Sequence, residues 1–338
     1  MKRFWTGSVA AIGLVVLILD AKTALYGAGE GIGLCLQSVI PSLLPFFILS
    51  ILLTGALTGV PIPILRPLGK LCGIPSGCES LLITGFLGGY PAGAQCIAQA
   101  YRAGQLDRND AGRLLGFCNN AGPAYLFGIV ASRFPNARCA WLLWGIHILS
   151  ALAVGILLPG RSLHHAKIPT GKPISLQNAI QSSIRILAGV CAWVIVFRTV
   201  IAFLERWFLW LIPEPAQVLL SGLLELSNGC CDLGRIPHPG LRFIIASGIL
   251  AFGGLCVVMQ TVSVTKGLGL GHYLPGKVLQ VAISILLSGF AQRFFLPQDQ
   301  CYRIPVYFYL VLISFTAFLP LSLKKIRKKS RNSAILPV

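Results

Sequence analysis

The chain has 338 residues, of which 55% are hydrophobic and 11% are charged, and its formal net charge is +18. Soluble domains carry about 25% charged residues, so this composition excludes an ordinary water-soluble protein. The Lys and Arg residues lie in short connections and near the C-terminus, without a stripe of interleaved aromatic residues, which argues against nucleic-acid binding. We therefore expect an all-α polytopic protein of the cell membrane, because a helix satisfies its own backbone hydrogen bonds within the lipid bilayer.

About ten apolar stretches approach the roughly 20 residues that a spanning helix needs. In chain order they are 8–26, 33–58, 80–103, 114–132, 139–159, 180–204, 216–232, 242–264, 273–291 and 303–323. The first resembles a signal peptide, but Asp20-Ala21-Lys22 stands where a cleavage site would need small residues. We therefore predict an uncleaved first span over 8–26.

Two of these stretches contain polar breaks. The stretch 80–103 is interrupted by Gly88-Gly89-Tyr90-Pro91-Ala92-Gly93, and 216–232 holds Glu225, Ser227, Asn228 and Gly229. Each is either a full span or a re-entrant helical hairpin, which turns back within the membrane. If all ten stretches span, 14 Lys and Arg residues lie in the inner segments and 10 lie in the outer segments. With eight spans and two hairpins, 17 lie in the inner segments and 7 in the outer segments. The positive-inside rule favours the hairpins.

This arrangement predicts one membrane domain, 1–338, with about eight spans and two hairpins. The last span is expected at 303–323, with the N-terminus and the basic tail 324–338 in the cytoplasm. A weak internal repeat leads to the same arrangement. Leu36-Gln37 recurs as Leu176-Gln177, and Gly85-Phe86-Leu87 recurs as Gly222-Leu223-Leu224. The two units, 33–159 and 176–291, would cross the membrane in opposite directions, and such inverted repeats are typical of secondary transporters.

Four short segments break the apolar pattern with glycine, proline and polar residues: 88–94, 118–123, 225–229 and 252–255. Irregular backbone at membrane depth needs a protein or water-filled surrounding, and helix N-termini that point into a cavity favour an anion. The alternative is that these residues merely permit close helix packing. The candidate solute-binding residues are Gly88, Gly89, Tyr90, Pro91, Asn119, Asn120, Gly122, Pro123, Glu225, Ser227, Asn228, Gly253 and Gly254.

Several of these residues have competing interpretations. Glu225 can take up a coupling proton or bind a cation, or it can be a structural carboxylate that accepts from backbone N–H groups. Ser227 and Asn228 can contact solute or cap a helix. Asn119 to Pro123 can offer free carbonyls to a cation, or an asparagine there can be a helix cap. Lys277 lies near the start of 273–291, where we expect its side chain to reach the membrane surface.

No pattern of a metal site, nucleotide-binding loop or nucleophile with its base is present in the sequence. We therefore expect no enzyme activity, no catalytic residue, no metal and no cofactor other than a coupling H⁺ or Na⁺. The expected partners are a small anionic solute and the lipid bilayer, and a homo-oligomer is compatible with the sequence.

The segments Gly88 to Ala94, Asn119 to Ala124 and Gly222 to Gly229 resemble the signature of the sporulation integral membrane protein YlbJ family. That family belongs to the group with nucleoside-recognition (Gate) domains, which is distantly related to concentrative nucleoside transporters. The resemblance covers about residues 30 to 290. It implies a carrier that moves dipicolinate, a flat pyridine dicarboxylate, across the forespore membrane of a sporulating cell. It also implies that Gly89 to Pro91 and Glu225 to Asn228 form hairpin tips, and that 119–123 and 253–254 interrupt helices.

Two other functions are compatible with the same sequence. One is a carrier of nucleosides or of another small metabolite with the same architecture. The other is a membrane scaffold for sporulation or envelope assembly that transports nothing.

Overall fold

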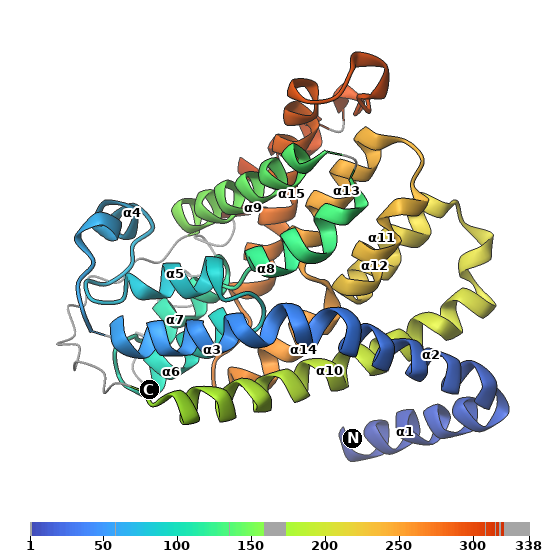
Figure 1. Cartoon of the computed structure of the whole chain (residues 1–338), viewed down its shortest axis with the longest axis horizontal. Helices are drawn as coiled ribbons and strands as arrows, with labels where there is room; N and C mark the ends of the chain where they lie inside the picture. The colour runs from blue at the N-terminus through green and yellow to red at the C-terminus, as the bar shows by residue number, and fades with distance from the viewer. Residues whose placement is uncertain are drawn as a thin grey trace, which may run out of the picture.

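The computed structural model describes residues 2–320, except 58, 135, 159–173, 308, 315 and 318. All regular elements in these ranges are helices (Figure 1), and the basic tail 324–338 lies outside the described residues. Five helical segments of the described chain are long and apolar enough to cross a membrane. They are Ala21–Leu57, Ala137–Leu157, Leu176–Trp207, Pro239–Val264 and Tyr273–Phe294. The prediction of an all-α polytopic membrane protein is confirmed.

The N-terminal helices differ in their limits from the predicted spans. Helix α1 is Lys2–Leu19 and α2 is Ala21–Leu34, so the stretch 8–26 is divided at Asp20. The Asp20 carboxylate accepts a hydrogen bond from the backbone N–H of Thr23 at 3.3 Å, which caps α2, and it pairs with Arg206 at 2.8 Å. Helix α2 then continues through a π-helical turn (Cys35–Val39) into α3 (Ile40–Leu57).

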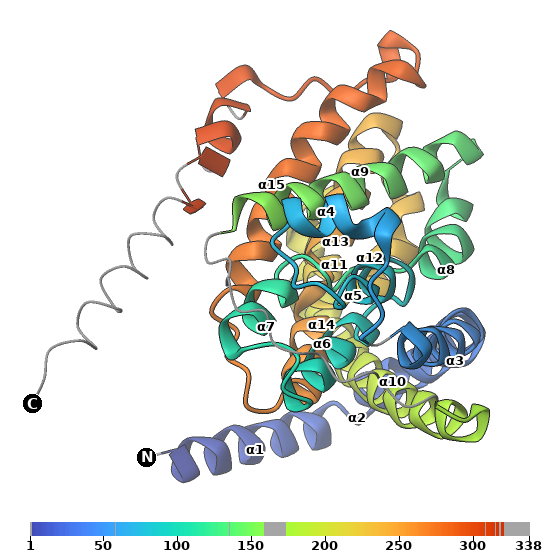
Figure 2. The ribbon, with the colours of Figure 1, turned by 90° about the vertical axis from the view of Figure 1, so that its left-hand side faces the viewer.

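The long segment α2–α3 packs antiparallel against α10 (Leu176–Trp207) along one side of the molecule (Figures 1 and 2). A β-carbon at Gly27 would lie 2.8 Å from Cα of Thr199, and one at Gly31 would lie 2.8 Å from Cα of Ile195. As the residue number rises by four on α2, it falls by four on α10, which fixes the antiparallel register. Glycines four residues apart let the two backbones approach closely, as in other membrane helix pairs.

Two pairs of short helices follow these long helices, one pair in each half of the chain. The first pair is α5 (Ser80–Leu87) and α6 (Ala92–Arg102), and the second is α11 (Glu214–Leu224) and α12 (Leu226–Asp232). A β-carbon at Gly93 would lie 3.2 Å from Cα of Gly85, and one at Gly229 would contact Cα of Gly222. Each pair therefore folds back on itself with glycines at the contact.

An interrupted helix and a long helix come after each pair. After α4 (Arg66–Leu71) and the first pair come α7 (Arg108–Leu115), α8 (Pro123–Tyr125), a π-helical turn (Leu126–Val130), a 3₁₀ turn (Ala131–Arg133) and α9 (Ala137–Leu157). After the second pair come α13 (Pro239–Phe252), α14 (Gly254–Val264) and α15 (Tyr273–Ala291). In both halves a pair of short helices is followed by interrupted helical segments and a long helix, and the long helices α3 and α10 are antiparallel.

The close contact between α2 and α10 predicts a position-specific effect of side-chain size. Gly31→Leu places a side chain against the α10 backbone, so it should destabilise the protein by about 1–3 kcal/mol, the usual cost of overpacking. Gly29→Leu on the same helix is the control, because a β-carbon at Gly29 meets nothing within 4 Å. Thermal melting in detergent should show a lower Tm for Gly31→Leu alone, and equal melting of both variants would contradict this packing.

Candidate functional site

The four interrupted segments of the sequence lie against one another in the interior. A β-carbon at Gly122 would lie 3.0 Å from Cα of Gly89, so the turn between α5 and α6 touches the segment before α8. The Tyr90 ring covers Gly253, where a β-carbon would meet its Cζ at 3.0 Å. At Gly254 a β-carbon would lie 3.2 Å from the Leu224 carbonyl oxygen, at the start of the α11–α12 turn.

Three glycines at these junctions adopt backbone conformations that other residues avoid. The φ angles are +76° at Gly89, +83° at Gly253 and +84° at Gly254. A side chain at these positions would be strained as well as crowded. Around them, Gly88 ends α5 and Pro91 precedes α6, whereas Gly122 and Pro123 begin α8. All of the candidate residues are buried except Pro123, which is half-buried.

The two asparagines are fully buried and join different segments. The Asn119 side-chain oxygen accepts from the backbone N–H of Ala94 in the first turn of α6 at 3.2 Å. Its amide nitrogen donates to the Thr261 hydroxyl at 3.0 Å. The Asn120 amide donates to the Phe117 carbonyl oxygen at 2.6 Å. Capping by an asparagine therefore occurs, but Asn119 caps α6 rather than the helix that follows it.

Lys277 lies at the centre of this cluster, and the prediction that its side chain reaches the membrane surface is wrong. Its side chain is fully buried, and its ammonium group donates to Tyr90 Oη at 3.1 Å, Asn120 Oδ1 at 3.2 Å and Gln280 Oε1 at 2.8 Å. No carboxylate of the described chain lies within ion-pair distance of it. Its amino group is thus held by neutral oxygen atoms.

His147 on α9 belongs to the same cluster and was not predicted from the sequence. Its Nε2 accepts from the backbone N–H of Ala121 at 3.1 Å, and its carbonyl oxygen accepts from the Gln280 amide at 3.4 Å. Its Nδ1 is buried without a hydrogen-bond partner among the described residues. Because Nε2 is an acceptor, Nδ1 is the nitrogen that carries the proton in the neutral ring. A single histidine in an apolar stretch belongs to no sequence motif. The only signal in the sequence is a polar residue among apolar neighbours.

Glu225 has a structural role in the second hairpin. It precedes α12, and its Oε2 accepts from both the backbone N–H and the side-chain amide of Asn228, each at 2.7 Å. The carboxylate therefore caps α12, whereas Ser227 and Asn228 lie in the first turn of that helix. Both are buried beside it.

Glu225 also lines a small cavity together with Tyr90, Tyr125, Ser227 and Gln260. The volume of this cavity is about 30 Å³. That space holds water but not a solute with a ring. The segments that form the cavity are therefore closed around it in this structure.

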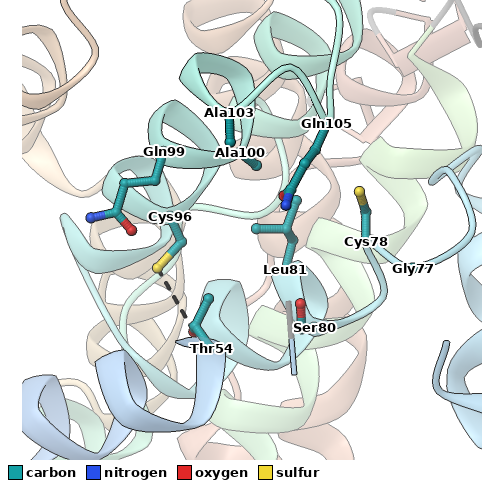
Figure 3. Close-up of a pocket in the computed structure, with 10 residues that line it drawn as sticks. All are labelled: Thr54, Gly77, Cys78, Ser80, Leu81, Cys96, Gln99, Ala100, Ala103 and Gln105. Carbon is teal, nitrogen blue, oxygen red and sulfur yellow. Dashed lines mark hydrogen bonds between the residues drawn. The ribbon is translucent and has the colours of Figure 1, made fainter. Parts of the chain in front are cut away.

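A second cavity of about 100 Å³ lies at the base of the first hairpin, beside the end of α3 (Figure 3). Its lining includes Gln105, which is 8% exposed, Ser80, and the thiols of Cys78 and Cys96. Figure 3 shows the Gln105 amide and the Ser80 hydroxyl directed toward this space. None of its lining side chains carries a formal charge, so it has the character of a polar pocket rather than of an anion site.

Among curated proteins, the chain is similar to the sporulation integral membrane protein YlbJ of Bacillus subtilis (strain 168). The two are 31% identical over 300 residues, and the match covers 74% of this chain and 73% of the relative. No protein-family model matches the chain, and no solved structure matches it.

The hydrogen bonds of Tyr90 predict a measurable loss of stability when its hydroxyl is removed. That hydroxyl accepts from Lys277 and donates to the Leu250 carbonyl oxygen at 3.4 Å. Tyr90→Phe should therefore cost about 1–3 kcal/mol, because it leaves a buried ammonium group with one acceptor fewer. Tyr101→Phe, at the end of α6, is the control, and thermal melting is the measurement. A Tyr90→Phe variant as stable as this control would contradict the proposed bonds.

Proposed function

Because the chain belongs to the family of the sporulation integral membrane protein YlbJ, we propose that it is a secondary carrier for a small planar anion. Dipicolinate during spore formation is the named candidate. The observation that carries this proposal is the fully buried side chain of Lys277, which no described carboxylate pairs with. In the proposal both termini are cytoplasmic, and the protein acts in the forespore membrane of a sporulating cell.

The electrostatics of Lys277 favour an anion over a neutral solute. Burying an ammonium group away from water costs several kcal/mol unless an opposite charge compensates it. Its three acceptors, Tyr90, Asn120 and Gln280, are neutral. A carboxylate of the solute would supply the missing negative charge when the segments open around it. Helix α6 begins directly after Pro91, and helix α14 begins directly after Gly253. The positive ends of their dipoles add to this preference for an anion.

The site is expected to open and close during transport. The cavity beside Glu225 holds about 30 Å³ in this structure, which is too small for a pyridine ring. Solute binding therefore requires the hairpin tips to separate from the interrupted helices. The contacts between them include close glycine contacts, the Tyr90 ring and the hydrogen bond from Ala94 to Asn119, and no ion pair of the described chain joins them. Rocking or sliding of one half against the other would give access from each side in turn.

Uptake of labelled dipicolinate into proteoliposomes tests the proposal. Wild-type protein should show saturable uptake, and Lys277→Gln should lower the initial rate at least about ten-fold, the effect of 1.4 kcal/mol or more. Lys266→Gln is the control, since it removes the same charge from an exposed residue after α14. Absence of saturable uptake by the wild type would contradict the carrier function. Stronger competition by nucleosides than by aromatic carboxylates would favour a nucleoside carrier instead.

We propose further that Glu225 couples transport to a proton or to Na⁺. Its Oε2 accepts a hydrogen bond from the backbone N–H of Asn228, and Glu225 lines the cavity of about 30 Å³ described above. Glu225→Gln keeps an oxygen that can cap α12 but loses the ionisable group, so its uptake should no longer respond to an imposed H⁺ or Na⁺ gradient. Glu214→Gln, at the exposed start of α11, should keep the wild-type response. Unchanged gradient dependence in Glu225→Gln would exclude this role.

A further inference from the structure

A third cavity lies away from the candidate site, where α9 and α13 begin and where the chain leaves α15. Its volume is about 400 Å³, against about 30 Å³ for the cavity beside Glu225. The lining side chains that bear on its chemistry are Arg133, Phe134, Cys139, Arg242 and Phe295. We name this space the arginine cavity. It is large enough for a small aromatic molecule in the observed conformation.

The two arginines give the lining of the arginine cavity a positive charge. No carboxylate lines it, and neither Arg133 nor Arg242 forms an ion pair with a described residue. The nearby Asp232 pairs with Arg235 at 3.8 Å and also interacts electrostatically with Arg133 from outside the cavity lining. The Nε of Arg133 is buried and has no hydrogen-bond partner in the described chain. An anion is the ligand that pairs with two arginine side chains lining one cavity.

Arg242 is held in place by backbone carbonyl groups. Its Nε and Nη2 donate to the carbonyl oxygen of Ile236 at 3.0 and 2.7 Å, and its Nη1 donates to the carbonyl oxygen of Arg133 at 3.0 Å. These bonds orient the guanidinium group and leave its charge uncompensated. The first turns of α9 and α13 also line the cavity, through Cys139 and Pro239. Their dipoles add positive potential on the same side.

Two phenylalanine rings form part of the remaining wall. The ring of Phe134 packs edge-on against Phe243, with ring centres 6.1 Å apart, and Phe295 packs against the same ring at 4.7 Å. Flat apolar walls beside two guanidinium groups suit a ligand with a flat ring and a carboxylate. A phosphate-bearing lipid headgroup shares the negative charge but lacks the ring.

We propose that the arginine cavity is a second binding site for an aromatic carboxylate, where the transported anion docks before it reaches Lys277. The identity of this ligand as the transported solute rests on the proposed function. The site itself depends only on the cavity, its two arginines and its aromatic walls. Occupancy there raises the local concentration of the anion and thus lowers KM, whereas Lys277 acts in the transport step.

Equilibrium binding of labelled dipicolinate to the full chain in nanodiscs of phosphatidylcholine tests this site. Wild-type protein should bind two molecules, and Arg133→Gln and Lys277→Gln should each lose one. Arg133→Lys, which keeps the charge, should retain two. Arg138→Gln removes a charge from the exposed first turn of α9 outside the cavity lining, so it should also bind two. In proteoliposomes Arg133→Gln should raise KM at least five-fold and keep the maximal rate within two-fold.

The two proposals fail in different ways. Binding and KM in Arg133→Gln equal to those in Arg138→Gln would overturn the arginine cavity as a solute site, even if wild-type uptake is normal. Loss of the Arg133-dependent dipicolinate binding when phosphatidylglycerol is added would show that the cavity binds lipid. That result would also overturn the proposed solute site. Two-site binding without any uptake would uphold the arginine cavity and contradict the carrier function.

Discussion

The interrupted helices depend on hydrogen bonds that other parts of the chain provide. A backbone N–H left without a partner in hydrocarbon costs several kcal/mol, and the chain meets this constraint with side chains from distant segments. The N–H of Ala94 bonds to Asn119, and the N–H of Ala121 bonds to His147. Because these two interruptions are completed by other elements, they are joined through side-chain hydrogen bonds in the interior. A movement of the first hairpin away from Asn119 must therefore exchange a hydrogen bond as well as apolar contacts.

Two buried ionisable side chains, Lys277 and Glu225, lie in this cluster without forming an ion pair. Lys277 bonds to the Tyr90 hydroxyl, and Tyr90 lines the cavity on which Glu225 also lies. The ring thus stands between the cation and the space beside the carboxylate. In the proposed carrier, this arrangement separates the group that binds the anion from the group that takes up the coupling ion. The arginine cavity extends the same principle, because it holds positive charge on neutral partners at a second location.

The sequence was sufficient to predict the fold class and the interrupted segments, because low charge content and glycine or proline in apolar runs are local signals. The depth of Lys277 was not predictable in this way. It lies only four residues into α15, but a β-carbon at its neighbour Gly276 would lie 2.7 Å from the Gly116 carbonyl oxygen. The start of α15 is therefore packed inside the protein instead of at the membrane surface. That contact joins residues 160 positions apart, and no local pattern reveals it.

The limits of the first helices were missed for a related reason. The run from Gly27 to Gly33 has four glycines and one glutamate, so it resembled a connection between two spans. In the structure it is helical, because Gly27 and Gly31 lie against α10. Glycine in a membrane protein thus marks either a turn or a close helix contact, and the choice depends on whether a partner helix lies beside it.

The helix pair formed by α2–α3 and α10 makes the protein responsive to the thickness of its membrane. The segment Ala21–Leu57 has 37 residues, which corresponds to a length of about 55 Å, whereas the hydrocarbon layer is about 30 Å thick. To lie wholly within that layer, the pair would tilt by about 57° from the bilayer normal, against a usual tilt of about 20°. At a smaller tilt, part of it projects into the headgroups. In both cases the length of the lipid chains determines the tilt of the helix pair or its depth in the bilayer. The two halves of the protein that the pair joins change their position with it.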